Sequence, residues 1–234
     1  MLLRKSKEKI LVDASTESEI KGVSRRNFLG YLGGASALML TAAACKKDDT
    51  PSNTGVDLGS GDKGILNYAY ALEQLEAAFY TQVIMTPYSG ITASESALLK
   101  DIRDHEIVHR EFFKAALGAS AIPGLEVNFT SINFSSRDSV LGTAKAFEDL
   151  GVTAYNGAGK LIISADYLTL AGKIVSVEAR HAAYIRDLIS NGTFADNTAL
   201  DANGLDMSRT PAQVLAIAGT YIKTAINASN LPTN

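Results

Sequence analysis

The chain has 234 residues, of which 46% are hydrophobic and 20% are charged, with a formal net charge of −3. This length suffices for one compact domain with appendages, and the lack of a basic excess argues against a nucleic-acid partner. A single cysteine, Cys45, excludes a disulfide within the chain and a cysteine-based zinc site.

Residues 1–45 have the pattern of an export signal rather than of a folded domain. The stretch SRRNFL, at 24–29, precedes a Gly- and Ala-rich apolar stretch that is too short and too weakly hydrophobic for a membrane span. It resembles a twin-arginine signal, and the small residues before Cys45 resemble a lipoprotein processing site. Ala42 stands where such sites usually have Leu, so cleavage without lipidation is the alternative. We expect export by a twin-arginine-type route to the periplasm or cell envelope, with a lipid anchor on Cys45.

A tether and four long helices are predicted next. Residues 46–61 are rich in Lys, Asp, Ser, Pro and Gly, which predicts a solvated tether. Residues 62–191 carry apolar side chains at helical spacing in four segments, at about 63–85, 94–117, 136–162 and 165–189. Residues 192–234 form an extension in which PAQVLAIAGTYIKTAI, starting at Pro211, predicts a short fifth helix.

The connections between the long helices differ in length. Short links join the first helix to the second and the third to the fourth, so each pair is expected to be an antiparallel hairpin. About eighteen residues, 119–136, connect the second helix to the third. A helix of about 22 residues is roughly 33 Å long, whereas eighteen extended residues reach up to roughly 60 Å. The connection can therefore return along the bundle, and one long crossover in an all-α four-helix bundle is the ferritin-like arrangement.

The two hairpins repeat each other in sequence. LEQLEAAFY (72–80) aligns with FEDLGVTAY (147–155), and HEIVHREFF (105–113) aligns with VEARHAAYI (177–185). From the lone glutamate to the Glu-x-x-His motif the spacing is 33 residues in the first half and 30 in the second. Two hairpins of the same design are thus expected to face each other across a pseudo-two-fold axis.

The repeat predicts a dinuclear metal site. Residues i and i+3 share one face of a helix, so each Glu-x-x-His motif can offer a carboxylate oxygen and an imidazole nitrogen to one metal. Four carboxylates nearly neutralise two divalent cations, and two of them can bridge the metals. Such a set is typical of di-iron and di-manganese carboxylate bundles. The predicted metal ligands are Glu73, Glu106, His109, Glu148, Glu178 and His181.

A second interpretation of the same residues is a zinc metalloprotease. His105, Glu106 and His109 form His-Glu-x-x-His, the helical signature of zinc proteases. Phe112 stands where the extended motif has Gly, and the one candidate for a third ligand, Glu126, lies in a linker. The sequence context therefore disfavours this alternative.

These motifs resemble the ferritin-like superfamily. Residues from about 62 to 191 are similar to bacterial ferritin-like domain proteins related to plant desiccation-related proteins. The resemblance is carried by the two Glu-x-x-His motifs, by the partner glutamates seven residues before a tyrosine, and by Asp-His-Glu at 104–106. It implies a four-helix bundle with a dinuclear site rather than a particular reaction.

The first helix offers two candidate glutamates. Glu73 is preferred as the ligand because the repeat aligns it with Glu148, whereas Glu76 aligns with Gly151. Glu76 is either an extra carboxylate at the site or an ordinary ion-paired residue.

Three further residues near the motifs have alternative roles. Tyr80 and Tyr155 can hydrogen-bond the ligands or supply electrons to an oxidised centre, and the alternative is ordinary core tyrosines. His105 lies about 100° around the helix from Glu106, which places it outside the ligand shell or on the surface.

The expected function is redox chemistry on dioxygen or hydrogen peroxide at two Fe or two Mn ions. Iron suits oxidase or peroxidase activity and manganese suits catalase-like activity, and the ligand types accept both. The alternatives are a metal-binding bundle without turnover and a structural stress-protection module. Whether the chain forms a homo-oligomer stays open.

Overall fold

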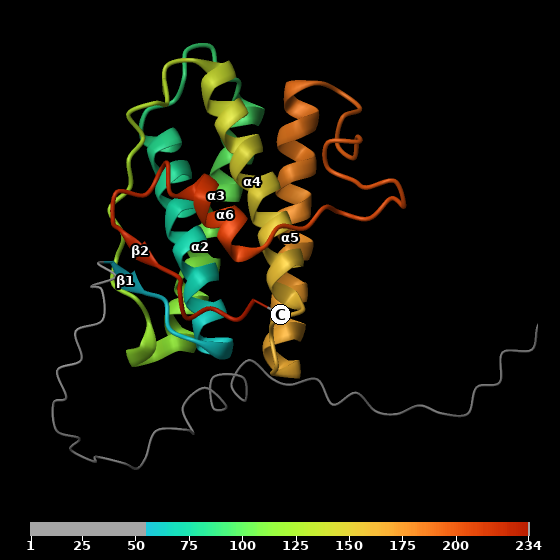
Figure 1. Ribbon diagram of the computed structural model, residues 1–234. Coiled ribbons are helices and arrows are strands. Elements are labelled where there is room, and N and C mark those ends of the chain that lie inside the picture. The colour runs from blue at the N-terminus through green and yellow to red at the C-terminus, as the bar shows by residue number, and fades with distance from the viewer. Residues whose placement is uncertain (1–54, 234) are drawn as a thin grey trace, which may run out of the picture. The chain divides into compact units, whose positions relative to one another are not determined.

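Four long helices pack as two hairpins in the computed structural model, which describes residues 55–233 (Figure 1). They are α2 (Gly61–Met85), α3 (Ala93–Leu117), α4 (Arg137–Gly159) and α5 (Ala165–Ile189). The most extensive packing is of α2 on α3 and of α4 on α5. The predicted all-α bundle with one long crossover is therefore confirmed.

Local signals in the sequence set the helix ends. The Thr92 hydroxyl accepts from the backbone N–H of Glu95, and the Glu95 side chain accepts from the backbone N–H of Thr92, which forms a capping box at the start of α3. Gly118 ends this helix with a φ of 53°, a conformation that favours glycine. The Ser136 and Ser164 hydroxyls cap α4 and α5 by accepting from the backbone N–H groups of Ser139 and Tyr167.

Helix α4 ends at Gly159, about three residues before its predicted end. The helix ends there because α2 holds the link between α4 and α5 by hydrogen bonds. The Asp62 carboxylate, in the first turn of α2, accepts from the backbone N–H groups of Ile163 and Ser164, each at 2.8 Å. Apolar periodicity in the sequence could not reveal this contact, which spans a hundred residues.

The crossover between α3 and α4 runs along α2. Gly118–Ser120 forms a short 3-10 turn, after which two polar side chains of α2 hold the extended chain. The Asn67 side chain accepts from Ile122 N–H at 3.0 Å, and the Gln74 side chain accepts from Leu125 N–H at 2.8 Å. These bonds satisfy backbone groups that the crossover would otherwise leave unpaired.

The folded part of the chain begins earlier than predicted. Residues 55–61 were expected to belong to the tether, but Val56–Asp57 forms a strand, β1, that pairs in parallel with β2 (Ile226–Asn227). Leu58, which follows β1, is fully buried in the core. The strand partner lies about 170 residues away in the sequence, so no local pattern marks the pairing.

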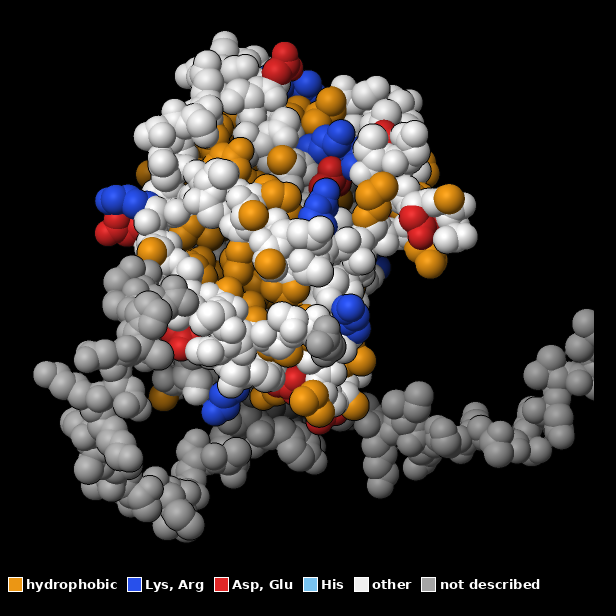
Figure 2. Space-filling view, in the orientation of Figure 1, with side chains coloured by type: hydrophobic (Ala, Val, Ile, Leu, Met, Phe, Trp, Pro, Cys, Tyr) orange, Lys and Arg blue, Asp and Glu red, His pale blue; other side chains and the backbone are white. Residues whose placement is uncertain are grey.

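The C-terminal extension packs against the side of the bundle. Its helix, α6 (Pro211–Ala218), starts at the predicted proline but ends eight residues before residue 226. Beyond the helix, the Tyr221 ring packs edge-on against Phe147 of α4, with ring centroids 4.8 Å apart. Hydrophobic side chains are most numerous in the middle of this face, over α2 and around α6 (Figure 2).

The predicted export signal and Cys45 lie outside the described residues, as does most of the tether. Within residues 55–233, none of the helices combines the length and the apolar character that a membrane span requires.

Candidate metal centre

The six predicted ligands meet in the middle of the bundle, and each is at most 9% exposed. The lone glutamates come from α2 and α4, and the two Glu-x-x-His motifs come from α3 and α5. The motif residues share one helix face, because three residues span nearly one turn. The structure places these side chains in two groups: Glu73, Glu106, His109 and Glu178, and Glu106, Glu148, Glu178 and His181.

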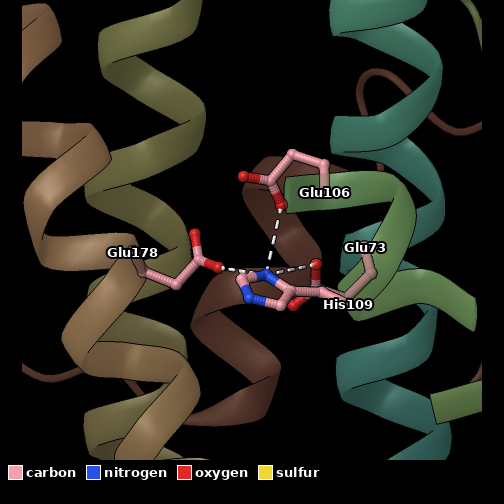
Figure 3. Close-up of side chains that lie close together, drawn as sticks. All are labelled: Glu73, Glu106, His109 and Glu178. Atoms are coloured by element: carbon pink, nitrogen blue, oxygen red, sulfur yellow. Dashed lines mark ion pairs between the residues drawn. The ribbon is translucent and has the colours of Figure 1, made fainter. Parts of the chain in front are cut away.

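Three carboxylates surround the imidazole of His109 (Figure 3). Its Nδ1 lies 2.8 Å from Glu178 Oε1, 3.6 Å from Glu73 Oε2 and 3.7 Å from Glu106 Oε2. These side chains come from three helices and converge on the one nitrogen (Figure 3).

The second group mirrors the first. His181 Nδ1 lies 2.8 Å from Glu106 Oε1, 3.4 Å from Glu148 Oε2 and 3.8 Å from Glu178 Oε2. In each group the shortest contact joins a histidine to the motif glutamate of the opposite hairpin. The pseudo-two-fold axis inferred from the repeat is therefore present in the geometry.

The atoms that converge here have no hydrogen-bond partner among the described residues. They include both oxygens of Glu106 and Glu178 and the Nδ1 atoms of both histidines. Although some of these atoms are 2.8 Å apart, none is aligned as a hydrogen bond requires. Buried carboxylates without partners are costly, and oxygen and imidazole donors aimed at common points suit divalent Fe or Mn. The residues therefore fit a dinuclear metal site, with Glu106 and Glu178 common to both groups.

Two tyrosines hold the remaining carboxylates. The Tyr80 hydroxyl on α2 donates to Glu148 on α4, and the Tyr155 hydroxyl on α4 donates to Glu73 on α2. Each tyrosine is at most 8% exposed. Of the alternatives for these residues, the geometry supports hydrogen bonding to the predicted ligands, which fixes the orientation of both carboxylates.

The comparison with protein families matches residues 61–191 to the ferritin-like domain. The chain belongs to the ferritin-like domain family. The matched region covers more than half of the chain and contains all four long helices and both Glu/His groups. No curated protein matches the chain.

Burial and neighbouring charges shift the pKa values of the buried histidines and carboxyls in this ferritin-like domain. Burial disfavours the charged form of both imidazoles, but the surrounding carboxylates outweigh it and raise the pKa of His109 and of His181 to about 12. Burial raises the pKa of Glu148 to about 7. Burial acts in the same direction on Glu178, but the two imidazoles outweigh it and lower the pKa of that carboxyl to about 2. Without metal, the imidazolium protons thus supply positive charge at the centre.

Glu76 is a fifth buried carboxylate beside the site. It is 3% exposed but belongs to neither Glu/His group, whereas Glu73 contacts His109. A Cβ added at Gly151 would lie 3.2 Å from Glu76 Oε1 and 3.6 Å from Glu178 Oε2. The glycine that the repeat aligns with Glu76 therefore makes room for the Glu76 carboxylate, which burial and its acidic neighbours hold at a pKa well above the ordinary range.

His105 contacts the site from outside. Its Nδ1 lies 2.9 Å from Nε2 of His181, and the two rings stack with centroids 5.2 Å apart. Burial and the neighbouring imidazoles lower the pKa of His105 below its ordinary value, so it is neutral at pH 7 and can accept a hydrogen bond. Sequence reasoning placed His105 outside the ligand shell but could not find its partner. Neither Glu/His group includes His105, which removes a ligand that the zinc-protease interpretation requires.

The two candidate glutamates of α2 can be separated by substitution. Glu73→Gln is expected to weaken metal binding by at least tenfold, because Glu73 faces His109, whereas Glu76→Gln is expected to retain both ions. Bound Fe or Mn is measured by elemental analysis after dialysis against a weak chelator. Loss of metal in Glu76→Gln alone would reverse the assignment.

His105→Ala should weaken the ion held by the His181 group by about 10- to 100-fold, because the Nε2–H of a metal-bound His181 loses its acceptor. The ion held by the His109 group should be unaffected, and His105→Gln, which keeps an acceptor oxygen, should recover part of the loss. Stepwise chelator competition with Mn²⁺ measures both affinities. Complete loss of both ions in His105→Ala would contradict this role and favour His105 as a ligand.

Metal loading is expected to release at least two protons per chain at pH 7. Both imidazoles are protonated in the metal-free chain, because their pKa values are raised to about 12, and each must lose its Nδ1 proton to bind metal. The product of the two binding constants should therefore rise at least a hundredfold per pH unit near neutrality, because Glu148, whose pKa is raised to about 7, also loses its proton on binding. Calorimetry in buffers of different ionisation enthalpy counts the protons, and release of fewer than two would contradict the assignment of both imidazoles.

Proposed function

We propose that this ferritin-like protein is an exported dinuclear iron or manganese protein that carries out redox chemistry on dioxygen or hydrogen peroxide. The observation that supports it most directly is the pair of buried Glu/His groups that share Glu106 and Glu178. A pair of metals that shares ligands requires carboxylates common to both groups. A site for a single metal would need only one of the two groups.

The donor set favours redox-active ions. Three carboxylates and one imidazole in each group, with two of the carboxylates in common, suit Fe and Mn, and four negative charges balance two divalent cations. When bound, such a pair supplies the electrons for cleavage of an O–O bond. The chain would hold the pair through Glu73, Glu106, His109, Glu148, Glu178 and His181.

The protein groups around the donors keep them in place. Tyr80 and Tyr155 orient two carboxylates, and His105 orients His181. The hydroxyl protons of Tyr80 and Tyr155 lie next to the centre. Burial raises the pKa of both hydroxyls well above the ordinary value. They therefore stay protonated and act as fixed donors to the carboxylates at neutral pH.

Export is part of the proposal and is supported by the sequence. The SRRNFL stretch at 24–29 resembles a twin-arginine signal, a route that carries folded proteins, so the metals could be inserted before export. Cys45 would then anchor the domain to the envelope membrane through lipid. We further propose that this chemistry serves protection against oxidative stress; the sequence resemblance to bacterial relatives of desiccation-related proteins supports this role.

The test begins with the segment from Gly55 onward, which keeps both residues of β1, loaded with Fe²⁺ or Mn²⁺. About two ions per chain are expected, with loss of both in Glu106→Ala because this carboxylate belongs to both groups. Glu111→Ala, an exposed acid on the same helix, is the matched control and should bind two ions. Consumption of dioxygen or peroxide should follow metal content across these variants.

Two results would change the conclusion. Two bound ions without oxygen or peroxide consumption would leave a metal-binding bundle without turnover. One zinc per chain that is retained in Glu106→Ala, or no metal under any loading condition, would overturn the dinuclear site itself.

A further inference from the structure

Among its ligands, the candidate metal centre meets solvent only at the two histidines. The four carboxylate ligands are 0% exposed, whereas the side chains of His109 and His181 are 11% and 6% exposed. The Nδ1 atoms that face the carboxylates are themselves buried, so the exposed area belongs to other atoms of the imidazole side chains. An ion that travels between solvent and the carboxylates must therefore pass an imidazole.

Other parts of the chain cover the remaining sides of the centre. The crossover runs along α2, where the side chains of Asn67 and Gln74 bind its backbone. The C-terminal extension lies against α4, where the Tyr221 ring packs on Phe147. Toward both ends of the bundle, buried apolar side chains of all four helices fill the core. The route between solvent and the centre therefore runs between α3 and α5, which carry the two histidines.

One of the two histidines is held on this side and the other is not. Nε2 of His181 lies 2.9 Å from Nδ1 of His105, and the two rings stack with centroids 5.2 Å apart. Within residues 55–233, no hydrogen bond or ion pair reaches Nε2 of His109, whose ion pairs all involve Nδ1. The sequence repeat explains the difference, because it aligns His105 with Val177, whose side chain can neither donate nor accept a hydrogen bond.

The hydrogen bond and the stacked ring restrict the movement of His181, because both contacts are lost when its imidazole turns away. Groups that fix a metal-binding imidazole in this way change metal affinity by about 10- to 100-fold. His109 has no such partner, so its imidazole turns away more often. The ion behind it is then open to water and to competing ligands.

We propose that the two positions of the centre exchange their metal ions at different rates, by the route between α3 and α5. The ion in the His109 group is the exchangeable one. The ion in the His181 group is the retained one, because His105 holds the imidazole that has to move. That the ions are divalent Fe or Mn rests on the proposed function. The chain would keep one ion when metal is scarce and complete the pair when metal is plentiful.

The experiment loads the domain from Gly55 onward with two Mn²⁺ ions and follows their release into an excess of a coloured chelator by stopped-flow absorbance. Two phases of one ion each are expected in the wild type, with rates that differ at least tenfold. In His105→Ala the slow phase should become at least tenfold faster while the fast phase stays unchanged, and His105→Gln should lie in between. Val108→Ala, at a 63% exposed position one turn along α3, is the control and should release both ions as the wild type does.

Val177→His tests the same idea in the opposite direction. The repeat predicts that residue 177 stands beside His109 as His105 stands beside His181, so the new imidazole should hold His109. The fast phase should then become about threefold slower or more, the range for one hydrogen bond, and the slow phase should not change. Circular dichroism and a count of two bound ions verify that the variant is folded.

The route is tested by the rate of Mn²⁺ uptake at low ionic strength. Val108→Lys places a positive charge one turn from His105 and should slow uptake several-fold, an effect that high salt removes. Ser131→Lys places the same charge on an exposed position of the crossover and should leave the rate unchanged. Equal slowing in the two variants would overturn the route between α3 and α5.

Release of both ions in one phase, or a slow phase that is the same in His105→Ala as in the wild type, would overturn the inference and leave the dinuclear centre standing. Two phases that respond to His105 in a protein that consumes neither dioxygen nor peroxide would support the inference and overturn the proposed redox function. A domain that binds no metal would overturn both.

Discussion

The burial of four carboxylates at the centre of an apolar bundle is the constraint on which the rest of the structure depends. Each is fully buried, each lies near the midpoint of its helix, and several of their oxygens have no hydrogen-bond partner in the described part of the chain. Such a group is tolerated when it is protonated or when positive charge compensates it. Protons on His109 and His181 supply it without metal, and two divalent cations would supply it with metal. Long helices are needed because they hold these side chains far from both ends of the bundle.

The two-fold repeat explains how one small motif builds the whole centre. Each hairpin contributes a glutamate, a Glu-x-x-His pair and a tyrosine, and the closest contacts run between hairpins rather than within them. Beside the centre, the repeat departs from symmetry where Glu76 faces Gly151 and where His105 stands on α3 with Val177 as its counterpart on α5. Both departures add a polar group to one side only. The two halves of the centre are therefore chemically inequivalent although their ligands match.

The surroundings of the centre also differ from side to side. The C-terminal extension covers the bundle along α4, where the backbone of Arg209 lies so close to Gly157 that any Cβ there would collide with it. The opposite side, between α3 and α5, carries the exposed His105.

The sequence by itself determined the helices, the crossover and the six residues that meet at the centre, because helical periodicity, capping residues and i, i+3 spacing are local properties of the chain. It also separated Glu73 from Glu76, through the repeat. Only the tertiary structure decided the contact of His105 with His181, the pairing of β1 with β2 and the space above Gly151. Each of these depends on the register between elements distant in sequence, and no local pattern encodes the distance between two helix faces.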